Sequence, residues 1–419
     1  MKTHRFVLLL ITVLGLLAYV NSLNGSFHFD DLPPIVENPL IQDLGNLPLL
    51  LASSRGVVMA TFALNYAISG IDVFGYHLFN TGLHILNAIL VYFILVFALT
   101  DNNQAHDAAW SQRIAAFTAF LFVVHPIQTQ AVSYIVQRFE VMASTFYLLG
   151  LVFFVVACRA QGKWQRVGLM ATVIVVYLIG LKSKEIAVTL PVALLLFDFC
   201  FVSRGQSRAM LQRWALHSVL LVICIFYVIS TLVRVGGRTQ IASLAEQGQV
   251  ASAGFAVKSV TAWEYFLTQT NVLLHYISLL VYPAQQNLDY DFPVAHSLWQ
   301  TPILADGAIL NAPLLPPFIA LLVLLALVVS ALFLLRKSAL VARLTGFCVL
   351  MFFLVLAPTS SFVPIVDLIN DHRAYLASAF FLVLPVLFFD WLGGRLSTVF
   401  QSVSAAKHPL VDKANDADN

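Results

Sequence analysis

The chain has 419 residues, of which 60% are apolar and only 11% are charged. A soluble domain carries about 25% charged residues, so this chain has too few charges to cover a surface that faces water. Its formal net charge of +2 gives no indication of nucleic-acid binding. The four cysteines lie within or beside apolar stretches without CxxC spacing, and they predict neither a disulfide framework nor a zinc site. The composition predicts an integral membrane protein.

Apolar stretches of about 20 residues, the length that a spanning helix needs, recur along the whole chain. The first follows Lys2 and Arg5, and we interpret it as a span because no small-residue cleavage site ends it. We expect ten spans, near residues 6–23, 76–99, 114–134, 139–158, 166–182, 185–202, 214–233, 314–335, 341–358 and 374–392. The predicted fold class is an all-α polytopic membrane protein. Its membrane domain covers residues 1–395, and a short polar cytoplasmic tail covers 396–419.

Lysine and arginine in the short loops predict a cytoplasmic N-terminus, because cytoplasmic loops carry an excess of these residues. Two long loops, 24–75 and 234–313, then lie on the outer face. The apolar segment 266–283 would break this alternation of sides if it crossed the membrane. Its polar residues, such as Gln269 and Asn271, also favour a position that lipid does not fully surround. We therefore expect a non-spanning helix on the outer face.

Charged residues at the outer ends of the spans need an explanation, because ionisable groups near membrane depth usually mark a function or a paired structural site. Asp30 and Asp31 follow the first span in the sequence FHFDD. Adjacent carboxylates at an aromatic boundary fit a general base or a cation ligand. The alternative is that Asp31, which precedes Leu32 and Pro33, caps a helix.

A second polar cluster runs from His125 to Glu140 and includes Arg138. This density of polar side chains between two apolar stretches exceeds what a plain turn requires. An internal ion pair between Arg138 and Glu140 is the structural alternative, and it is compatible with a function.

A third cluster contains Lys182, Lys184 and Glu185. Two lysines at an outer boundary oppose the general charge trend, and they suit a phosphate or pyrophosphate group. The alternative is that their side chains extend to lipid headgroups.

Two further clusters lie later in the chain. Tyr290 and Asp291 fit sugar binding, through ring stacking and hydrogen bonds to hydroxyls, or simply a solvated loop. Asp371, His372 and Arg373 stand where a short outer loop enters the last span. An arginine fork at this position suits a phosphate, and an ion pair with a nearby aspartate is the alternative.

Taken in order, these clusters resemble a known family. The matching segments are FHFDD, TFALNYAISG, YHLFNTGLHILNA, HPIQTQAVSYIVQRFEVMAS, KSKEIAVTLP, LDYDF and SSFVPIVDLINDHRAYLAS. The chain resembles, over residues 20–380, the membrane domain of the transmembrane O-mannosyltransferases that carry TPR repeats, and their shorter prokaryotic relatives. These enzymes have the GT-C fold. The sequence contains no 34-residue repeat, so acceptor recruitment is expected to differ.

The resemblance implies transfer of a sugar from a polyprenyl-phosphate monosaccharide to a hydroxyl acceptor. It implies that Asp30 and Asp31 supply the catalytic carboxylate. Residues implied to bind the phosphate or lipid of the donor are Arg138, Lys182, Lys184 and Arg373, with His125 and His372 as helpers. Candidates for sugar or acceptor contacts, or for supporting roles, are Glu140, Glu185, Tyr290, Asp291 and Asp371.

The expected function is therefore that of a membrane glycosyltransferase, with a mannose-like hexose as the sugar and a protein Ser or Thr as the acceptor. Alternatives are a lipid or polysaccharide acceptor, a lipid or solute transporter, and a non-enzymatic scaffold. A transporter is expected to place its charges in mid-span or at broken helices of repeated halves. No cofactor is expected. A divalent cation on the paired aspartates is an alternative that we do not favour. The expected location is a bacterial plasma membrane with a periplasmic site, or the endoplasmic reticulum membrane in a eukaryote.

Overall fold

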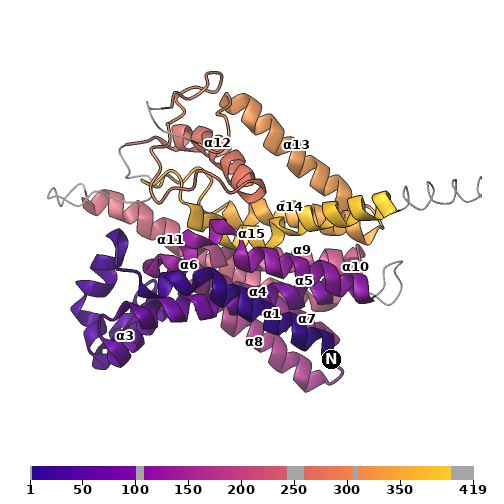
Figure 1. The fold of residues 1–419 in the computed structure, drawn as a ribbon, viewed down its shortest axis with the longest axis horizontal. Coiled ribbons are helices and arrows are strands. Elements are labelled where there is room, and N and C mark those ends of the chain that lie inside the picture. The colour runs from indigo at the N-terminus through magenta and orange to yellow at the C-terminus, as the bar shows by residue number, and fades with distance from the viewer. Residues whose placement is uncertain (1, 101–107, 243–258, 305–309, 398–419) are drawn as a thin grey trace, which may run out of the picture.

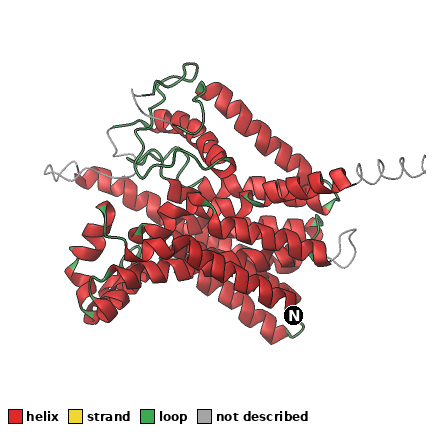
Figure 2. Ribbon diagram, viewed as in Figure 1, coloured by secondary structure: helices red, strands yellow, loops and turns green. Residues whose placement is uncertain are grey.

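The computed structural model describes residues 2–100, 108–242, 259–304 and 310–397. These residues form α-helices joined by short 3-10 and π turns and by loops, with no β-strand among them (Figures 1 and 2). The α-helices are α1 (Lys2–Tyr19), α2 (Leu47–Ala52), α3 (Gly56–Ser69), α4 (Val73–Leu99), α5 (Ala108–Val124), α6 (Thr129–Ser133), α7 (Arg138–Arg159), α8 (Lys163–Leu181), α9 (Leu190–Phe197), α10 (Ser207–Met210), α11 (Trp214–Ala242), α12 (Ala262–Val281), α13 (Pro317–Leu335), α14 (Leu340–Leu356) and α15 (Tyr375–Phe381).

Eight of the ten expected spans coincide with helical segments long and apolar enough to cross a membrane. These segments are Thr3–Asn24, Val73–Leu99, Ile135–Arg159, Lys163–Leu181, Glu185–Val202, Ser207–Val233, Pro317–Leu335 and Asp371–Ser397. The expected span 114–134 is instead a bent pair, in which α5 and α6 meet at 51°. The expected span 341–358 corresponds to the shorter helix α14. The all-α polytopic fold class is confirmed, and the chain is an integral, multi-pass membrane protein.

One end of the bundle is held together by polar contacts between the starts and ends of distant helices. The ring Nδ1 of His4 lies 2.7 Å from the hydroxyl of Tyr92, late in α4. Asp390 accepts hydrogen bonds from Trp110 at 2.8 Å and from Arg113 at 2.7 Å. The N-terminus is therefore at the same end as the start of α5 and the end of the last span, as the predicted alternation of sides requires (Figure 1).

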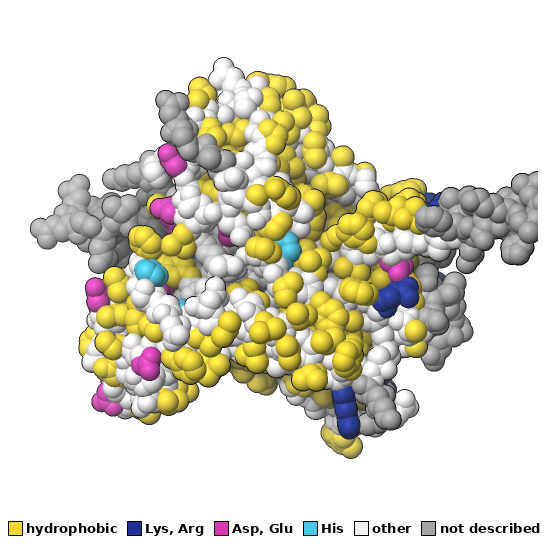
Figure 3. Space-filling view, viewed as in Figure 1, with side chains coloured by type: hydrophobic (Ala, Val, Ile, Leu, Met, Phe, Trp, Pro, Cys, Tyr) yellow, Lys and Arg dark blue, Asp and Glu magenta, His cyan; other side chains and the backbone are white. Residues whose placement is uncertain are grey.

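The exposed charges are distributed unevenly between the two ends. On the face drawn in Figure 3, Lys and Arg side chains gather at the end that carries the N-terminus in Figure 1. Most of the Asp and Glu side chains on that face lie at the other end. This distribution agrees with an inner end that is basic, and we refer to the two ends as inner and outer.

Residues 29–69 form a lobe at the outer end, which we call the amino-terminal lobe. It has its own small core, in which Ile35 and Phe62 of the lobe pack with Tyr76 of α4, with Ile135 just before α7, and with Phe139 in the first turn of α7. The lobe is therefore packed against the outer ends of α4 and α7.

Helix α12 lies along the loop 357–370, which connects α14 to the last span. Its Tyr265 donates to the carbonyl of Thr359 at 2.6 Å, and its Gln269 donates to that of Leu368 at 2.9 Å. These contacts with an outer loop support the expected non-spanning position, which remains a prediction. Parts of the expected outer loop 234–313 and nearly all of the expected tail 396–419 lie outside the described residues.

Arg138 joins the amino-terminal lobe to the bundle. Its side chain is fully buried and donates to Asn80 at 2.7 Å, to Asn65 at 2.6 Å, to Thr61 at 3.2 Å and to the carbonyl of Tyr76 at 3.1 Å. The guanidinium also lies over three aromatic rings, including that of Phe62 at 4.5 Å from the ring centre. These contacts use both sides and most edges of the planar group, which only arginine offers.

We predict that Arg138→Lys destabilises the protein by roughly 3 kcal/mol or more, because an ammonium group cannot replace the fork of hydrogen bonds and each lost bond leaves a buried partner unsatisfied. Thermal unfolding of the purified protein in detergent measures the effect. Arg336→Lys is the control, since Arg336 is exposed at the end of α13. Equal melting temperatures for the two variants would contradict the structural role of Arg138.

We also predict that Gln286 and Gln206 lie on opposite sides of the membrane. Both are exposed, Gln286 after α12 and Gln206 before α10. In a variant without the native cysteines, an impermeant maleimide added to intact cells should label Gln286→Cys and leave Gln206→Cys unlabelled. Labelling of Gln206→Cys alone would invert the assignment of outer and inner ends, and labelling of neither residue would place α12 on the inner side.

Candidate functional site

The segment 125–137, between α5 and α7, connects the clusters that were predicted from distant parts of the sequence. Its Tyr134 hydroxyl accepts a hydrogen bond from the backbone N–H of Asp30 at 2.7 Å. Its Gln130 accepts one from the backbone N–H of His372 at 2.6 Å and donates to the carbonyl of Leu288 at 3.0 Å. The first outer loop, the loop after α12 and the start of the last span therefore meet at the outer end of the bundle.

The structure separates the two adjacent aspartates. Asp31 is buried, and its carboxylate accepts the backbone N–H of Val136 at 2.7 Å and that of His28 at 3.0 Å. Burial raises the pKa of Asp31 to about 6, although both hydrogen bonds act in the opposite direction. The expected cap of the helix that follows is not formed, because the Asp31 side chain makes no hydrogen bond to the turn Leu32–Val36. Asp30 is the exposed carboxylate of the pair.

The backbone next to Asp30 is in an uncommon conformation. Phe29 has a φ of 41°, in the left-handed region that residues with a side chain rarely adopt. Such strain persists only where the surroundings impose it. Here the hydrogen bonds of Asp31 and the contact of Asp30 with Tyr134 fix the loop on both sides of the turn.

Cationic side chains from separate segments lie near the outer ends of α7 and of the last span. Lys184 forms a buried ion pair with Glu140 at 2.8 Å, and Arg55 forms a more exposed pair with Glu185 at 3.2 Å. The expected alternative, an ion pair between Arg138 and Glu140, is therefore wrong, because the partner of Glu140 is a lysine from the loop after α8.

Arg373 is the third cation of this cluster. Only 6% of it is exposed, and its Nη2 donates to the carbonyl of Asp367 at 2.9 Å, while its buried Nη1 has no hydrogen-bond partner among the described residues. The expected alternative partner, Asp371, instead accepts from the hydroxyl of Tyr290 at 3.0 Å. An arginine that keeps a buried donor free is suited to bind an anion.

His372 lies among these cations, since the charges of Lys184, Arg373 and Arg55 all act on its ring. We call Arg55, Glu140, Lys184, Glu185, His372 and Arg373 the outer cluster.

Four of the predicted site residues lie apart from the outer cluster or are engaged elsewhere. Arg138 is enclosed in the structural network described above. His125 is buried and accepts from the backbone N–H of Ile127 at 3.3 Å, as a cap of the turn that follows. Lys182 is exposed and donates to the carbonyl of Ser53 at 3.2 Å, and Asp291 is exposed. Of the two lysines in this motif, Lys184 is the one in the cluster.

Two residues of the site region were assigned no role from the sequence. Arg55 belongs to the outer cluster, and the signal that was overlooked is an isolated arginine in an outer loop. His77 is buried, and neither of its ring nitrogens has a hydrogen-bond partner among the described residues. Its Nε2 lies where the backbone of Gly25 approaches closely, since a Cβ at Gly25 would be only 2.9 Å away. A bound hydroxyl or water is a suitable partner for this imidazole.

Among the described residues, no three His, Cys, Asp or Glu side chains converge in the manner of metal ligands. The Asp31 carboxylate accepts two backbone N–H groups, one on each oxygen.

Comparisons with known proteins find relatives of one kind. A protein O-mannosyl-transferase of Caenorhabditis elegans is 30% identical over 204 residues, which are 45% of this chain and 27% of that protein. One of Drosophila melanogaster is 27% identical over 319 residues, 70% of this chain and 32% of the relative. A human one is 32% identical over 174 residues, 37% of this chain and 19% of the relative.

No family model matches the chain, and no solved structure matches it. The matched region spans about a third or less of the length of these curated relatives. The similarity extends over 70% of this chain in the longest of the three matches. The chain is thus similar in sequence to protein O-mannosyl-transferases, which confirms the resemblance inferred from its motifs.

Proposed function

We propose that this protein is a membrane glycosyltransferase that moves a mannose-like hexose from a polyprenyl phosphate to the hydroxyl of a protein Ser or Thr on the outer face of the membrane. The names of its relatives support O-mannosyl transfer to protein. The observation that carries the proposal is the meeting, at one end of the bundle, of an exposed carboxylate and a cationic cluster from distant parts of the sequence.

The acceptor hydroxyl and the leaving lipid phosphate each need a different chemical group from the protein. An acceptor hydroxyl becomes an effective nucleophile when a base removes its proton, and the exposed Asp30 is our candidate for this base. The oxygen attacks the anomeric carbon as the bond from that carbon to the phosphate oxygen breaks. The electron pair of that bond leaves with the lipid phosphate. Arg373 and Lys184 then stabilise the charge that develops on the phosphate. No step is assigned to a metal.

Other residues of the site have supporting roles in this proposal. Asp31 holds the loop that carries Asp30, and Glu140 orients Lys184 through their ion pair. Tyr290 and Asp371, which are hydrogen-bonded to each other, are placed to contact the sugar or the acceptor. We propose a bacterial plasma membrane with the site on its periplasmic side as the location, or the endoplasmic reticulum membrane in a eukaryotic source.

A transporter is the alternative that the positions of the charges disfavour. Ionisable groups of a transporter are expected near mid-membrane at broken helices. The outer cluster lies instead at helix ends, with Glu140 in the first turn of α7 and Lys184 directly after α8.

We predict that Asp30→Asn lowers the transfer rate by at least about a hundredfold, because general-base catalysis typically contributes that much or more. The measurement is transfer to an acceptor peptide from a panel of polyprenyl-phosphate hexoses by the purified full chain in detergent. Glu37→Gln is the control, as an exposed carboxylate of the same loop. Unchanged activity of Asp30→Asn would refute the base assignment.

Asp31→Asn, unlike Asp30→Asn, is expected to lower the free energy of unfolding of the protein. Its amide nitrogen would face a backbone N–H in place of one carboxylate oxygen, which should cost about 1–3 kcal/mol of unfolding free energy. The raised pKa also means that the folded protein binds this proton more tightly than the unfolded chain does. The contribution of Asp31 to stability should therefore increase as the pH falls from 7 toward 4, and Asp31→Asn should lack this increase. Identical pH profiles of melting temperature would contradict this explanation.

We predict that Arg373→Ala raises the KM for the lipid-phosphate donor about tenfold or more and leaves the KM for the acceptor peptide nearly unchanged, because the lost contact is to the phosphate. Steady-state kinetics with each substrate varied in turn provides the test. Lys182→Ala is the matched control, an exposed cation of the neighbouring loop whose loss should change neither constant appreciably. Equal effects of Arg373→Ala on both substrates would count against phosphate binding.

A further inference from the structure

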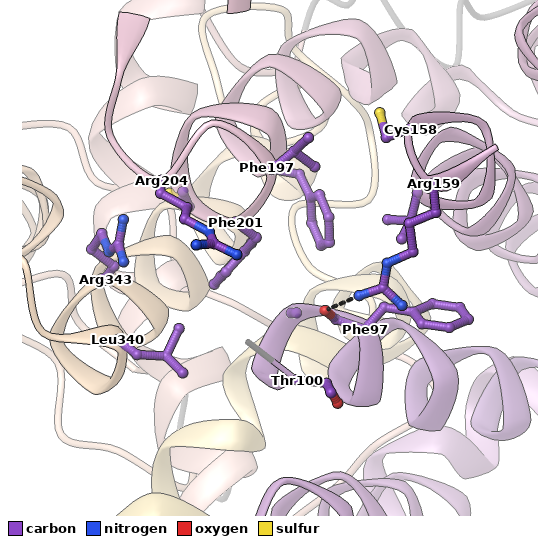
Figure 4. A pocket seen from close by; sticks show the side chains of 13 residues that line it. Phe97, Thr100, Cys158, Arg159, Phe197, Phe201, Arg204, Leu340 and Arg343 are labelled. Carbon is purple, nitrogen blue, oxygen red and sulfur yellow. Dashed lines mark hydrogen bonds between the residues drawn. The ribbon is translucent and has the colours of Figure 1, made fainter. Parts of the chain in front are cut away.

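A cavity of about 170 Å³ lies at the inner end of the bundle, away from the outer cluster (Figure 4). It is bounded by the ends of α4 and α7, by the start of α14 and by the π turn Asp198–Val202 that follows α9. Because α4 and α7 end, and α14 begins, on the inner side, the cavity opens at the predicted cytoplasmic boundary. We call it the inner pocket.

Three arginines line the inner pocket, and its described lining contains no Asp or Glu. In the view of Figure 4, Arg204 and Arg343 approach from one side and Arg159 from the other. The carboxylate of Asp198 is engaged outside the lining, where Arg213 donates to it at 2.6 and 2.7 Å. The pocket therefore brings together guanidinium groups from three separate segments of the chain.

Arg343 is the least expected of the three arginines. Only 5% of it is exposed, and its Nε is buried without a hydrogen-bond partner among the described residues. Arginines at a cytoplasmic boundary usually extend their charged ends into water. A buried guanidinium donor without an acceptor is costly unless a ligand satisfies it.

The backbone beside the pocket is also strained. Arg204 has a φ of 52° and Gly205 one of 83°, so two successive residues are in the left-handed region. The N–H of Gly205 is bonded to the carbonyl of Phe199 at 2.7 Å, which closes the turn. A Cβ at Gly205 would lie 3.8 Å from Nη1 of Arg343, so this turn packs next to the buried guanidinium. Strain of this kind, in a residue other than glycine, is concentrated at functional sites.

The remaining walls are apolar and aromatic. Phe97, Phe197 and Phe201 line the pocket. Arg159 is fixed against the first of them, since its Nη2 donates to the carbonyl of Phe97 at 3.0 Å and its guanidinium lies 4.8 Å from the centre of that ring. The pocket therefore offers guanidinium groups for an anionic headgroup and aromatic walls for the apolar part of the same ligand.

The geometry points to the inner pocket as a binding site for a phosphate group, held by Arg159, Arg204 and Arg343. Guanidinium groups bind phosphate through paired charge-assisted hydrogen bonds, and the free Nε of Arg343 is one donor of such a pair. The apolar walls and the position at the inner boundary favour the headgroup phosphate of an anionic lipid of the cytoplasmic leaflet. Inorganic phosphate is the other source of the same chemistry.

The test uses the delipidated full chain in detergent, with native mass spectrometry and thermal unfolding as readouts. The probes are dioleoyl phosphatidylglycerol, dioleoyl phosphatidylcholine and inorganic phosphate. We expect phosphatidylglycerol to remain bound and to raise the melting temperature, and phosphatidylcholine to do neither. Arg343→Gln and Arg204→Gln should each weaken phosphatidylglycerol binding about tenfold, the effect of one lost charge-assisted contact.

Arg336→Gln is the matched control, because Arg336 is an exposed arginine of the same end outside the pocket. Arg204→Gln changes an exposed side chain and keeps the test valid if Arg343→Gln fails to fold. A response to inorganic phosphate alone, lost in Arg204→Gln, would support the phosphate site with a soluble source. Equal binding of the two lipids, equal loss in Arg336→Gln, or no response to any phosphate would overturn the proposal. Because all readouts are of binding, they are independent of sugar transfer.

Discussion

The outer end of this protein depends on one buried cation. Among the described residues, Arg138 has no carboxylate partner for its charge, and amide, hydroxyl and carbonyl oxygens and aromatic faces stabilise it there. Burying a charge in this way is unfavourable unless every donor is directed at an acceptor. The requirement fixes the relative positions of α3, α4 and α7, because Asn65, Asn80 and Arg138 belong to three different helices. The amino-terminal lobe is therefore held in one orientation against the bundle.

That orientation has a direct consequence for the site. The start of α7 follows immediately after the segment 125–137, which supports the loop of Asp30 on one side and His372 on the other. Fixing Arg138 thus fixes the segment that both halves of the candidate site contact. A residue that binds no substrate in our proposal still determines how far the carboxylate lies from the cations. The broken span contributes as well, since the bend between α5 and α6 lets this segment run across the bundle end instead of continuing along a helix.

The sequence was informative about the fold and about which helix ends lie together, because apolar length and the distribution of basic residues can both be read along the chain. Apolar length predicted the spans, and the excess of basic residues in short loops predicted which helix ends lie together. The clusters of polar residues correctly indicated where the chain departs from simple helical turns. The roles within a cluster were harder to predict. Arg138 and Arg373 have the same chemistry and similar surroundings in the sequence, yet one is saturated by interior acceptors and the other keeps a donor free.

The partners of such residues come from segments far apart in the chain, so spacing could not identify them. Glu140 was expected to pair with its near neighbour Arg138 and pairs instead with Lys184. The two adjacent aspartates have different surroundings because a distant backbone N–H, that of Val136, binds only one of them. Arg55 was not recognised because nothing in its local sequence relates it to Glu185.

The pairing within the outer cluster determines which charge state of a ligand it matches. Lys184 and Arg55 are each neutralised by a glutamate, and Arg373 is left without a carboxylate partner among the described residues. A sugar linked to a lipid through phosphate is a diester with one negative charge. The released lipid phosphate is a monoester, which carries close to two negative charges at neutral pH. On the proposed chemistry, the cluster is electrically balanced with the donor and carries excess negative charge with the product. Electroneutrality would then favour exchange of the spent lipid phosphate for fresh donor.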